Sequence, residues 1–229
     1  MTTELILALD LDDRKKALYW VKRLYPKVKI FKVGLELYSA CGPQIVRDIR
    51  KIGADVFLDL KLNDIPNTMA KAAKQAVKHK AAMLTVHTLS GPTALKEVSD
   101  ICRGSKTKVL GVTVLTSISG DFLKDLGINR PLDSEVLYLA KMAKRCGLDG
   151  VVCSAHEAKK IKKEHLGRNF IILTPGIRPK ASAKKDQKRI ATPGEAARAG
   201  ADFIVVGRPI LEAKDPLKAT KEILLEAGG

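Results

Sequence analysis

Eight short apolar runs recur along the chain, and each is followed by a stretch of helical length with an amphipathic pattern. The runs are LILALDL (5–11), KIFKVG (29–34), ADVFLDLK (54–61), AAMLTVHT (81–88), VLGVTVLT (109–116), LDGVVCS (148–154), NFIILTPG (169–176) and ADFIVVG (201–207). Nearly continuous Val, Ile, Leu and Ala is typical of parallel strands that are covered on both faces. Strand–helix alternation repeated eight times predicts a closed (β/α)8 TIM barrel, formed by a single domain over residues 1–229.

The intervening stretches end as helices end. Gly53, Gly147 and Gly200 each close an amphipathic stretch just before the next apolar run, where a helix C-cap is expected. A doubly wound open sheet is the alternative arrangement of the same elements. No GxGxxG follows the first apolar run, however, so the dinucleotide-binding form of that fold is disfavoured.

Composition excludes several classes of protein. No apolar run is long enough to span a bilayer, so we expect no membrane association. The first residues, MTTELILALDLDD, lack the basic region of a secretory signal and carry Glu4 and Asp10 early. The four cysteines are scattered without a CxxC pair, which favours reduced thiols. We therefore expect a cytoplasmic protein.

The formal net charge is +16, which suits a nucleic acid, an anionic membrane or a phosphorylated substrate. The lysines mostly punctuate helical patterns, as in AKAAKQAVKHK and HEAKKIKKEH, and this favours solvated helix faces. Aromatic residues make up only 4% of the chain, so few side chains are available for base stacking. We expect no nucleic-acid partner and a surface that attracts small anions.

In a TIM barrel the active site lies at the carboxyl ends of the strands. Polar residues and turn residues at those ends are Asp10, Lys32, Asp59, Lys61, His87, Thr116, Ser154, Pro175, Gly176, Gly207 and Arg208. The longest stretch without a clear strand or helix is GIRPKASAKKDQKRIATPG, residues 176–194. Loops of this length in compact domains are usually functional or disordered. We expect residues 178–190 to close over a bound phosphate.

Charged residues at and just beyond the ends of two of these strands form a cluster. Asp59 and Lys61 are two apart on a strand and share a face, which must be the barrel interior because Leu58 and Leu60 suit the helix side. Lys32 ends the preceding strand and points at the same mouth. Asp64 lies past the strand end and heads the next helix, so we expect two lysines and two acids to alternate around one small space. A structural ion pair is the alternative, but burying both charges is costly and contributes little stability. Pairing with acids keeps Lys61 protonated, so it can donate a proton.

The combination of ALDLDD, FKVG, DLKLNDIPNT, LTS, PGIRP, DQKRIATPGEA and VVGRPI, spread from residue 8 to residue 210, resembles the orotidine 5'-phosphate decarboxylase family. The acid–Lys–acid signature is shared by a wider superfamily, whereas Lys32 in KVG and the loop that holds Gln187 are narrower features. The resemblance implies removal of CO2 from C6 of orotidine 5'-monophosphate to give uridine 5'-monophosphate, with no metal and no cofactor.

The resemblance also implies residue roles. Asp59 lies beside the substrate carboxylate, Lys61 stabilises and protonates the C6 carbanion, and Asp64 completes the catalytic set. Asp64, with Ile65 and Thr68, belongs to a segment that enters the neighbour's site across the interface of a homodimer with shared active sites. The remaining substrate-binding residues that it implies are Asp10 and Lys32 at the ribose, Thr116 at the pyrimidine, and Pro175, Arg178, Gln187, Gly207 and Arg208 at the phosphate end.

Two other functions compete with this one. A superfamily relative acting on a sugar phosphate, such as a keto-gulonate phosphate decarboxylase or a hexulose phosphate synthase, uses Mg2+ and has EVG where this chain has KVG. Lys32 would repel a metal at that position. A basic RNA-binding barrel without activity is the other alternative, but a nucleic-acid binder needs no acids in its mouth.

Overall fold

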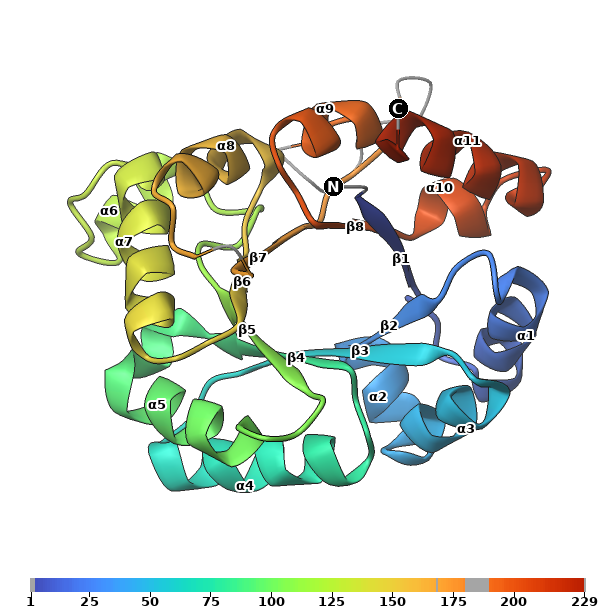
Figure 1. The fold of residues 1–229 in the computed structure, drawn as a ribbon, viewed down its shortest axis with the longest axis horizontal. Helices are drawn as coiled ribbons and strands as arrows, with labels where there is room; N and C mark the ends of the chain where they lie inside the picture. Colours follow the sequence, from blue (N-terminus) through green and yellow to red (C-terminus); the bar gives the residue numbers. More distant parts are fainter. Residues whose placement is uncertain (1–2, 168, 180–189, 229) are drawn as a thin grey trace.

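The computed structural model describes residues 3–167, 169–179 and 190–228. Eight parallel strands close into a barrel in the order β1-β2-β3-β4-β5-β6-β7-β8, and the helices lie around its outside (Figure 1). The predicted TIM barrel is therefore confirmed. The strands are β1 (Glu4–Ala8), β2 (Ile30–Gly34), β3 (Asp55–Leu62), β4 (Met83–His87), β5 (Lys108–Val112), β6 (Gly150–Val152), β7 (Ile171–Thr174) and β8 (Phe203–Val206).

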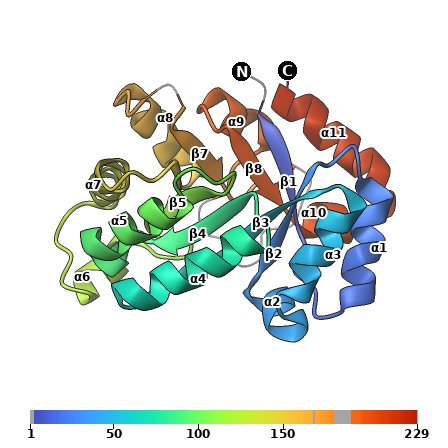
Figure 2. The ribbon, with the colours of Figure 1, turned by 60° about the horizontal axis from the view of Figure 1, so that its bottom comes forward.

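The helices follow the predicted stretches, with short extra helices after some strands (Figure 2). They are α1 (Arg14–Leu24), α2 (Leu35–Cys41), α3 (Gln44–Ile52), α4 (Pro66–Lys78), η1 (Thr88–Ser90), α5 (Gly91–Cys102), α6 (Gly120–Asp125), α7 (Leu132–Arg145), α8 (Ala155–Lys163), α9 (Pro193–Arg198), α10 (Arg208–Leu211) and α11 (Pro216–Gly228). Gly53, Gly147 and Gly200 have φ angles of 98°, 82° and 91°, the left-handed conformation expected where each helix ends.

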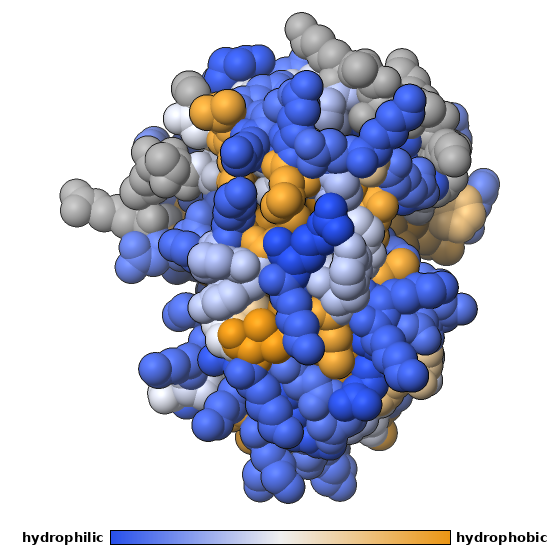
Figure 3. Space-filling view, turned by 90° about the vertical axis from the view of Figure 1, so that its right-hand side faces the viewer, coloured by the Kyte–Doolittle hydropathy of each residue, from blue (hydrophilic) through white to orange (hydrophobic). Residues whose placement is uncertain are grey.

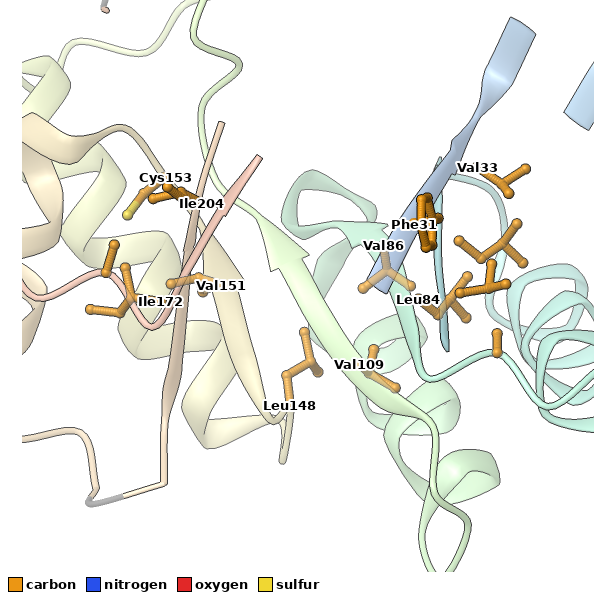
Figure 4. Packing of buried hydrophobic residues seen from close by; sticks show 14 of the residues in the cluster. Phe31, Val33, Leu84, Val86, Val109, Leu148, Val151, Cys153, Ile172 and Ile204 are labelled. Carbon is orange, nitrogen blue, oxygen red and sulfur yellow. The ribbon is translucent and has the colours of Figure 1, made fainter. Parts of the chain in front are cut away.

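Two apolar layers hold the barrel together. The larger layer lies between the strands and the helices, where alternate strand residues such as Phe31, Val33, Leu84 and Val86 point outward (Figure 4). The smaller layer fills the barrel interior and consists of Ile6, Ala8, Ile30, Phe57, Met83, Leu110, Val112, Val152, Leu173 and Val205. Because these apolar side chains fill the barrel interior beneath the carboxyl ends of the strands, a ligand can enter only at the mouth.

β3 departs from regular pairing at its carboxyl end. Leu58 pairs with Leu84 and Leu62 pairs with Val86, so three residues of β3 lie opposite a single residue of β4. Within this irregular segment the backbone of Lys61 has a left-handed conformation, with a φ angle of 49°. Asp59 and Lys61 nevertheless both point into the mouth of the barrel while Leu58 and Leu60 pack on the helix side, so the predicted alternation through Lys61 is confirmed and only the register shift was not expected.

The side of the barrel that carries α1 and α11 shows mostly polar residues with small separated apolar patches (Figure 3). Within the described residues, no helix has the length and apolar character needed to cross a membrane. The four thiols are free, with Cys102 and Cys153 buried and the other two partly buried.

Candidate active site

A cavity of about 270 Å³ opens at the carboxyl ends of the strands. Its floor is formed by apolar residues of the inner layer, including Ala8, Phe57 and Val205. Ten residues predicted from the sequence to lie at the site line this cavity: Asp10, Lys32, Asp59, Lys61, Thr116, Pro175, Gly176, Arg178, Gly207 and Arg208. These residues come from strand ends far apart in the sequence, and barrel closure brings them together.

Acids and bases alternate along one wall of the cavity. The Lys32 Nζ atom lies 2.8 Å from Oδ1 of Asp10 and 3.8 Å from Oδ2 of Asp59. The Lys61 Nζ atom donates to the same Asp59 oxygen at 2.9 Å. The Asp59 and Lys32 side chains are each 12% exposed, whereas that of Lys61 is 33% exposed. The Lys61 ammonium is thus anchored by Asp59 while it stays accessible to a ligand in the cavity.

Thr85 joins this cluster from β4, although it was not among the predicted site residues. Its hydroxyl donates to Oδ1 of Asp59 at 3.0 Å and accepts the backbone N–H of Lys61 at 2.8 Å. The residue is fully buried. A threonine within the apolar run MLTVH is typical of an ordinary strand, so the sequence does not single it out. Only the pairing of β4 with β3 in the closed barrel places it beside Asp59 and Lys61.

The part of the cavity formed by residues after β7 and β8 is suited to an anion. Gly207 and Arg208 follow β8, with Arg208 as the first residue of α10, and both line the cavity with Pro175. Arg178 is held by a hydrogen bond of 2.9 Å from its backbone N–H to the carbonyl of Ala191. A TIM barrel commonly binds phosphate after strands seven and eight, and Arg supplies a forked set of donors for it.

Asp64 and Thr68 lie outside this cavity. Both are exposed, and Asp64 accepts the backbone N–H of Ile65 at 2.6 Å. Asp64 precedes α4, which begins at Pro66, so it stands just before the helix rather than in its first turn. Among the residues that the structure describes, no hydrogen bond or ion pair joins Asp64 to Asp59 or Lys61, so a single chain does not bring Asp64 into the predicted charged cluster.

Gln187 and most of the loop predicted to close over the phosphate fall within residues 180–189, which lie outside the described residues. On either side of this segment, Ile177 and Ala191 form an isolated parallel bridge. The role of Gln187 stays a prediction.

Two other polar residues at strand ends serve local structure. His87 accepts the backbone N–H of Leu89 through Nδ1 at 3.3 Å, and burial, aided by the charge of Lys61, lowers its pKa. Ser154 is buried and its backbone N–H donates to Glu157 at 2.9 Å at the start of α8. Neither lines the cavity.

Metal-ligating side chains do not gather in the part of the chain that the structure describes. No group of three or more His, Cys, Asp and Glu residues there has the geometry to hold a metal ion. The cavity instead combines two ammonium groups, which donate hydrogen bonds, with two carboxylates, which accept them. This combination is suited to a charged organic ligand.

Comparison with known proteins gives a consistent family. A family model described as Orotidine 5'-phosphate decarboxylase / HUMPS family matches residues 3–223. A protein named orotidine 5'-phosphate decarboxylase from Syntrophotalea carbinolica is 46% identical over 230 residues, which cover 97% of this chain and 94% of that protein. A protein of the same name from Wolbachia pipientis is 47% identical over 220 residues, covering 96% of each chain.

Solved structures agree with the sequence matches. The crystal structure of orotidine 5'-phosphate decarboxylase from Lactobacillus acidophilus has a TM-score of 0.87 at 39% identity, covering 99% of this chain and 100% of that one. The enzyme from Methanocaldococcus jannaschii, complexed with the inhibitor BMP, has a TM-score of 0.80 at 26% identity and full coverage of both chains. The chain therefore belongs to the orotidine 5'-phosphate decarboxylase / HUMPS family, and within it resembles the proteins named orotidine 5'-phosphate decarboxylase.

Proposed function

We propose that this barrel converts orotidine 5'-monophosphate to uridine 5'-monophosphate and CO2 without a metal, with Lys61 as the group that stabilises and protonates C6. Family membership and the names of relatives at 43–47% identity support the decarboxylation of this nucleotide as a step of pyrimidine biosynthesis. The observation that carries the residue assignment is the Lys61 ammonium, held 2.9 Å from Asp59 at the edge of the cavity.

The reaction places a specific demand on the protein. When the C6–carboxylate bond breaks, CO2 leaves and the electron pair stays on C6, in an orbital that the ring does not delocalise. A preorganised ammonium beside that carbon stabilises the developing negative charge, in the manner of an oxyanion hole. The Lys61 ammonium then transfers one proton to C6 and recovers it from solvent. Asp59, the anchor of Lys61, lies beside the departing carboxylate.

The other residues of the cavity bind the rest of the nucleotide in this proposal. Asp10 and Lys32, joined at 2.8 Å, offer an acceptor and a donor to the ribose hydroxyls. Thr116, which lines the cavity, contacts the pyrimidine in this proposal. Arg208, with Gly207, binds the phosphate. These contacts hold C6 against the ammonium of Lys61, and such positioning accounts for much of an enzyme's rate enhancement.

The sugar-phosphate alternative is weakened by Lys32. Its ammonium occupies the position where that group of relatives was expected to have a glutamate, and it lies within 3.8 Å of both Asp10 and Asp59. A divalent cation placed between these acids would meet that positive charge directly. The RNA-binding alternative is weakened by the same acids, because Asp10 and Asp59 would repel phosphates at the mouth. The absence of a nucleic-acid partner and a cytoplasmic location stay predictions.

A homodimer with shared sites is part of the proposal. Large apolar side chains are exposed just after three neighbouring strands: Leu35 after β2, Ile65 after β3 and Leu89 after β4, with exposed fractions of 58%, 66% and 52%. These three side chains follow the carboxyl ends of adjacent strands, and Asp64 and Thr68 follow the middle strand, β3. Pairing these rims would bury the apolar side chains and bring Asp64 toward the partner's cavity.

The purified protein should be mixed with orotidine 5'-monophosphate in excess EDTA, and the loss of orotate absorbance followed. We expect full turnover, equal to that without the chelator. An activity that disappears with EDTA and returns with Mg2+ would contradict the metal-free mechanism. No turnover under either condition, in a folded protein, would contradict the substrate assignment.

A further inference from the structure

Thr85 bridges the two charged residues at the centre of the proposed mechanism. Where β3 shifts register, the segment from Leu58 to Leu62 has extra residues against Thr85 of β4. The backbone N–H of Lys61 bonds the Thr85 hydroxyl at 2.8 Å instead of a carbonyl of β4. A side chain therefore takes the place of a backbone acceptor at the residue whose φ is 49°, in the left-handed region that side chains other than glycine adopt rarely.

The direction of these hydrogen bonds is fixed by their chemistry. The N–H of Lys61 can only donate, so the Thr85 oxygen accepts it, and the single proton of the hydroxyl is free to donate to Oδ1 of Asp59 at 3.0 Å. The other Asp59 oxygen accepts Nζ of Lys61 at 2.9 Å. The backbone of Lys61, the Thr85 hydroxyl, the Asp59 carboxylate and the Lys61 ammonium thus form a closed ring.

We propose that Thr85 is a positioning residue for the decarboxylation: its hydroxyl fixes the backbone of Lys61 and the orientation of the Asp59 carboxylate, and so sets where the Lys61 ammonium lies. This inference rests on the function proposed above. Full burial of Thr85 means that the hydroxyl has no water to replace either bond if one is lost. Loss of the hydroxyl would leave the Lys61 N–H and one carboxylate oxygen without this partner, and both groups would be free to turn.

Thr107 supplies a matched control. It too is a buried threonine, but its hydroxyl donates to the backbone carbonyl of Ala81 at 2.7 Å, just before β4 and β5 begin and so at the far end of these strands from the mouth. Thr85→Val and Thr107→Val each replace a buried hydroxyl by a methyl group of similar size. A purely structural role for both hydroxyls predicts similar losses of thermal stability and no change in the turnover of folded enzyme.

The test is the steady-state kinetics of these variants, with thermal melts to measure the folded fraction. Thr85→Val should lower kcat by ~10- to 100-fold with KM little changed, the scale expected for a displaced catalytic group. Thr107→Val should leave kcat within about twofold of that of the unmodified enzyme, because its hydroxyl is far from the mouth. A second pair, Thr85→Ser and Thr85→Ala, differs only in the hydroxyl, and Ser should keep most of the kcat that Ala loses. This pair decides the question if Thr85→Val does not fold.

Equal kcat for Thr85→Ser and Thr85→Ala, or an unchanged kcat in Thr85→Val, would overturn the inference. Lys61→Ala is measured beside them so that failure of the positioning role of Thr85 can be distinguished from failure of the proposed mechanism. If Lys61→Ala abolishes turnover while the Thr85 variants are normal, the positioning role is wrong and the proposed mechanism stands. If Lys61→Ala retains turnover, the mechanism itself is wrong.

Discussion

Gly34 leaves the space into which the ammonium of Lys32 folds. A Cβ atom at this position would lie 2.6 Å from Nζ of Lys32 and 3.7 Å from Oδ1 of Asp10. The backbone φ of Gly34 is −93°, which any residue adopts, so the constraint is steric rather than conformational. Since the clashing atom is the end of a flexible side chain, Lys32 would move and the barrel would not.

We therefore predict that Gly34→Ala lowers kcat/KM by ~10-fold or more, because Lys32 loses its contacts with the two acids, while the melting temperature changes little. Gly120→Ala is the matched control, since a Cβ there meets nothing within 4 Å. Kinetics and thermal melts of the two variants give the answer. A normal kcat/KM for Gly34→Ala would show that the position of Lys32 is unimportant.

Arg208 is expected to act through the phosphate alone. Arg208→Ala should weaken the reaction of the nucleotide by ~1.5–3 kcal/mol, the range for hydrogen bonds to a charged group. The slow reaction of orotidine, the nucleoside without phosphate, should be nearly unaffected. Comparing the loss of kcat/KM with the nucleotide and with orotidine shows whether Arg208 acts through the phosphate. Equal losses with nucleotide and nucleoside would mean that Arg208 does not bind the phosphate.

Residue types alone predicted much of this cavity. Charged Asp59 and Lys61 at the end of an apolar strand are conspicuous, because such groups are rarely buried without a purpose. Thr85 was not predicted, since a threonine in a strand is common and its partners are distant in sequence. The space at Gly34 also cannot be predicted from the sequence, because it depends on how the Lys32 side chain folds back in three dimensions.

At the scale of elements, strand and helix positions followed from apolar periodicity, but details of pairing did not. The run 109–116 was expected as one strand, yet β5 ends at Val112. The register shift in β3 leaves no mark in the sequence, because it arises from pairing with β4 and from the left-handed Lys61. Periodicity reports which face is buried, and it does not report where a ladder is interrupted.

Ser154 shows that a polar residue at a strand end can serve its helix instead of the site. Its backbone and hydroxyl both bond Glu157 in the first turn of α8. Ser154→Ala should lower the free energy of unfolding by about 1 kcal/mol, as the loss of a cap does, with kcat unchanged. Chemical denaturation and steady-state kinetics measure the two quantities. A large fall in kcat at unchanged stability would instead place Ser154 in the catalytic machinery.

At the scale of the whole molecule, closure of eight strands explains why a site scattered from Asp10 to Arg208 becomes one cavity. The order of elements in the sequence predicts that closure, and with it the end of the barrel where the chemistry lies. The assembly is a separate matter, because a single chain carries Asp64 and Thr68 on its exposed surface.

The shared site can be tested by mixing two inactive dimers. Lys61→Ala and Asp64→Ala homodimers should each be nearly inactive, because each lacks one catalytic group in both sites. After subunit exchange, a heterodimer holds one site with both groups intact, so activity should return. Exchange is verified with differently tagged chains. No recovery despite exchange would mean that each chain supplies its own Asp64.

The central claim is that the Lys61 ammonium stabilises and protonates C6, and the turnover of Lys61→Ala with orotidine 5'-monophosphate tests it most directly. The side chain is partly exposed and its removal leaves the apolar layers untouched, so circular dichroism and the melting curve should show a folded barrel. We predict a fall in kcat/KM of at least ~100-fold, the scale for one preorganised donor. Turnover within ~10-fold of the unmodified enzyme, about 1.4 kcal/mol, would contradict the account.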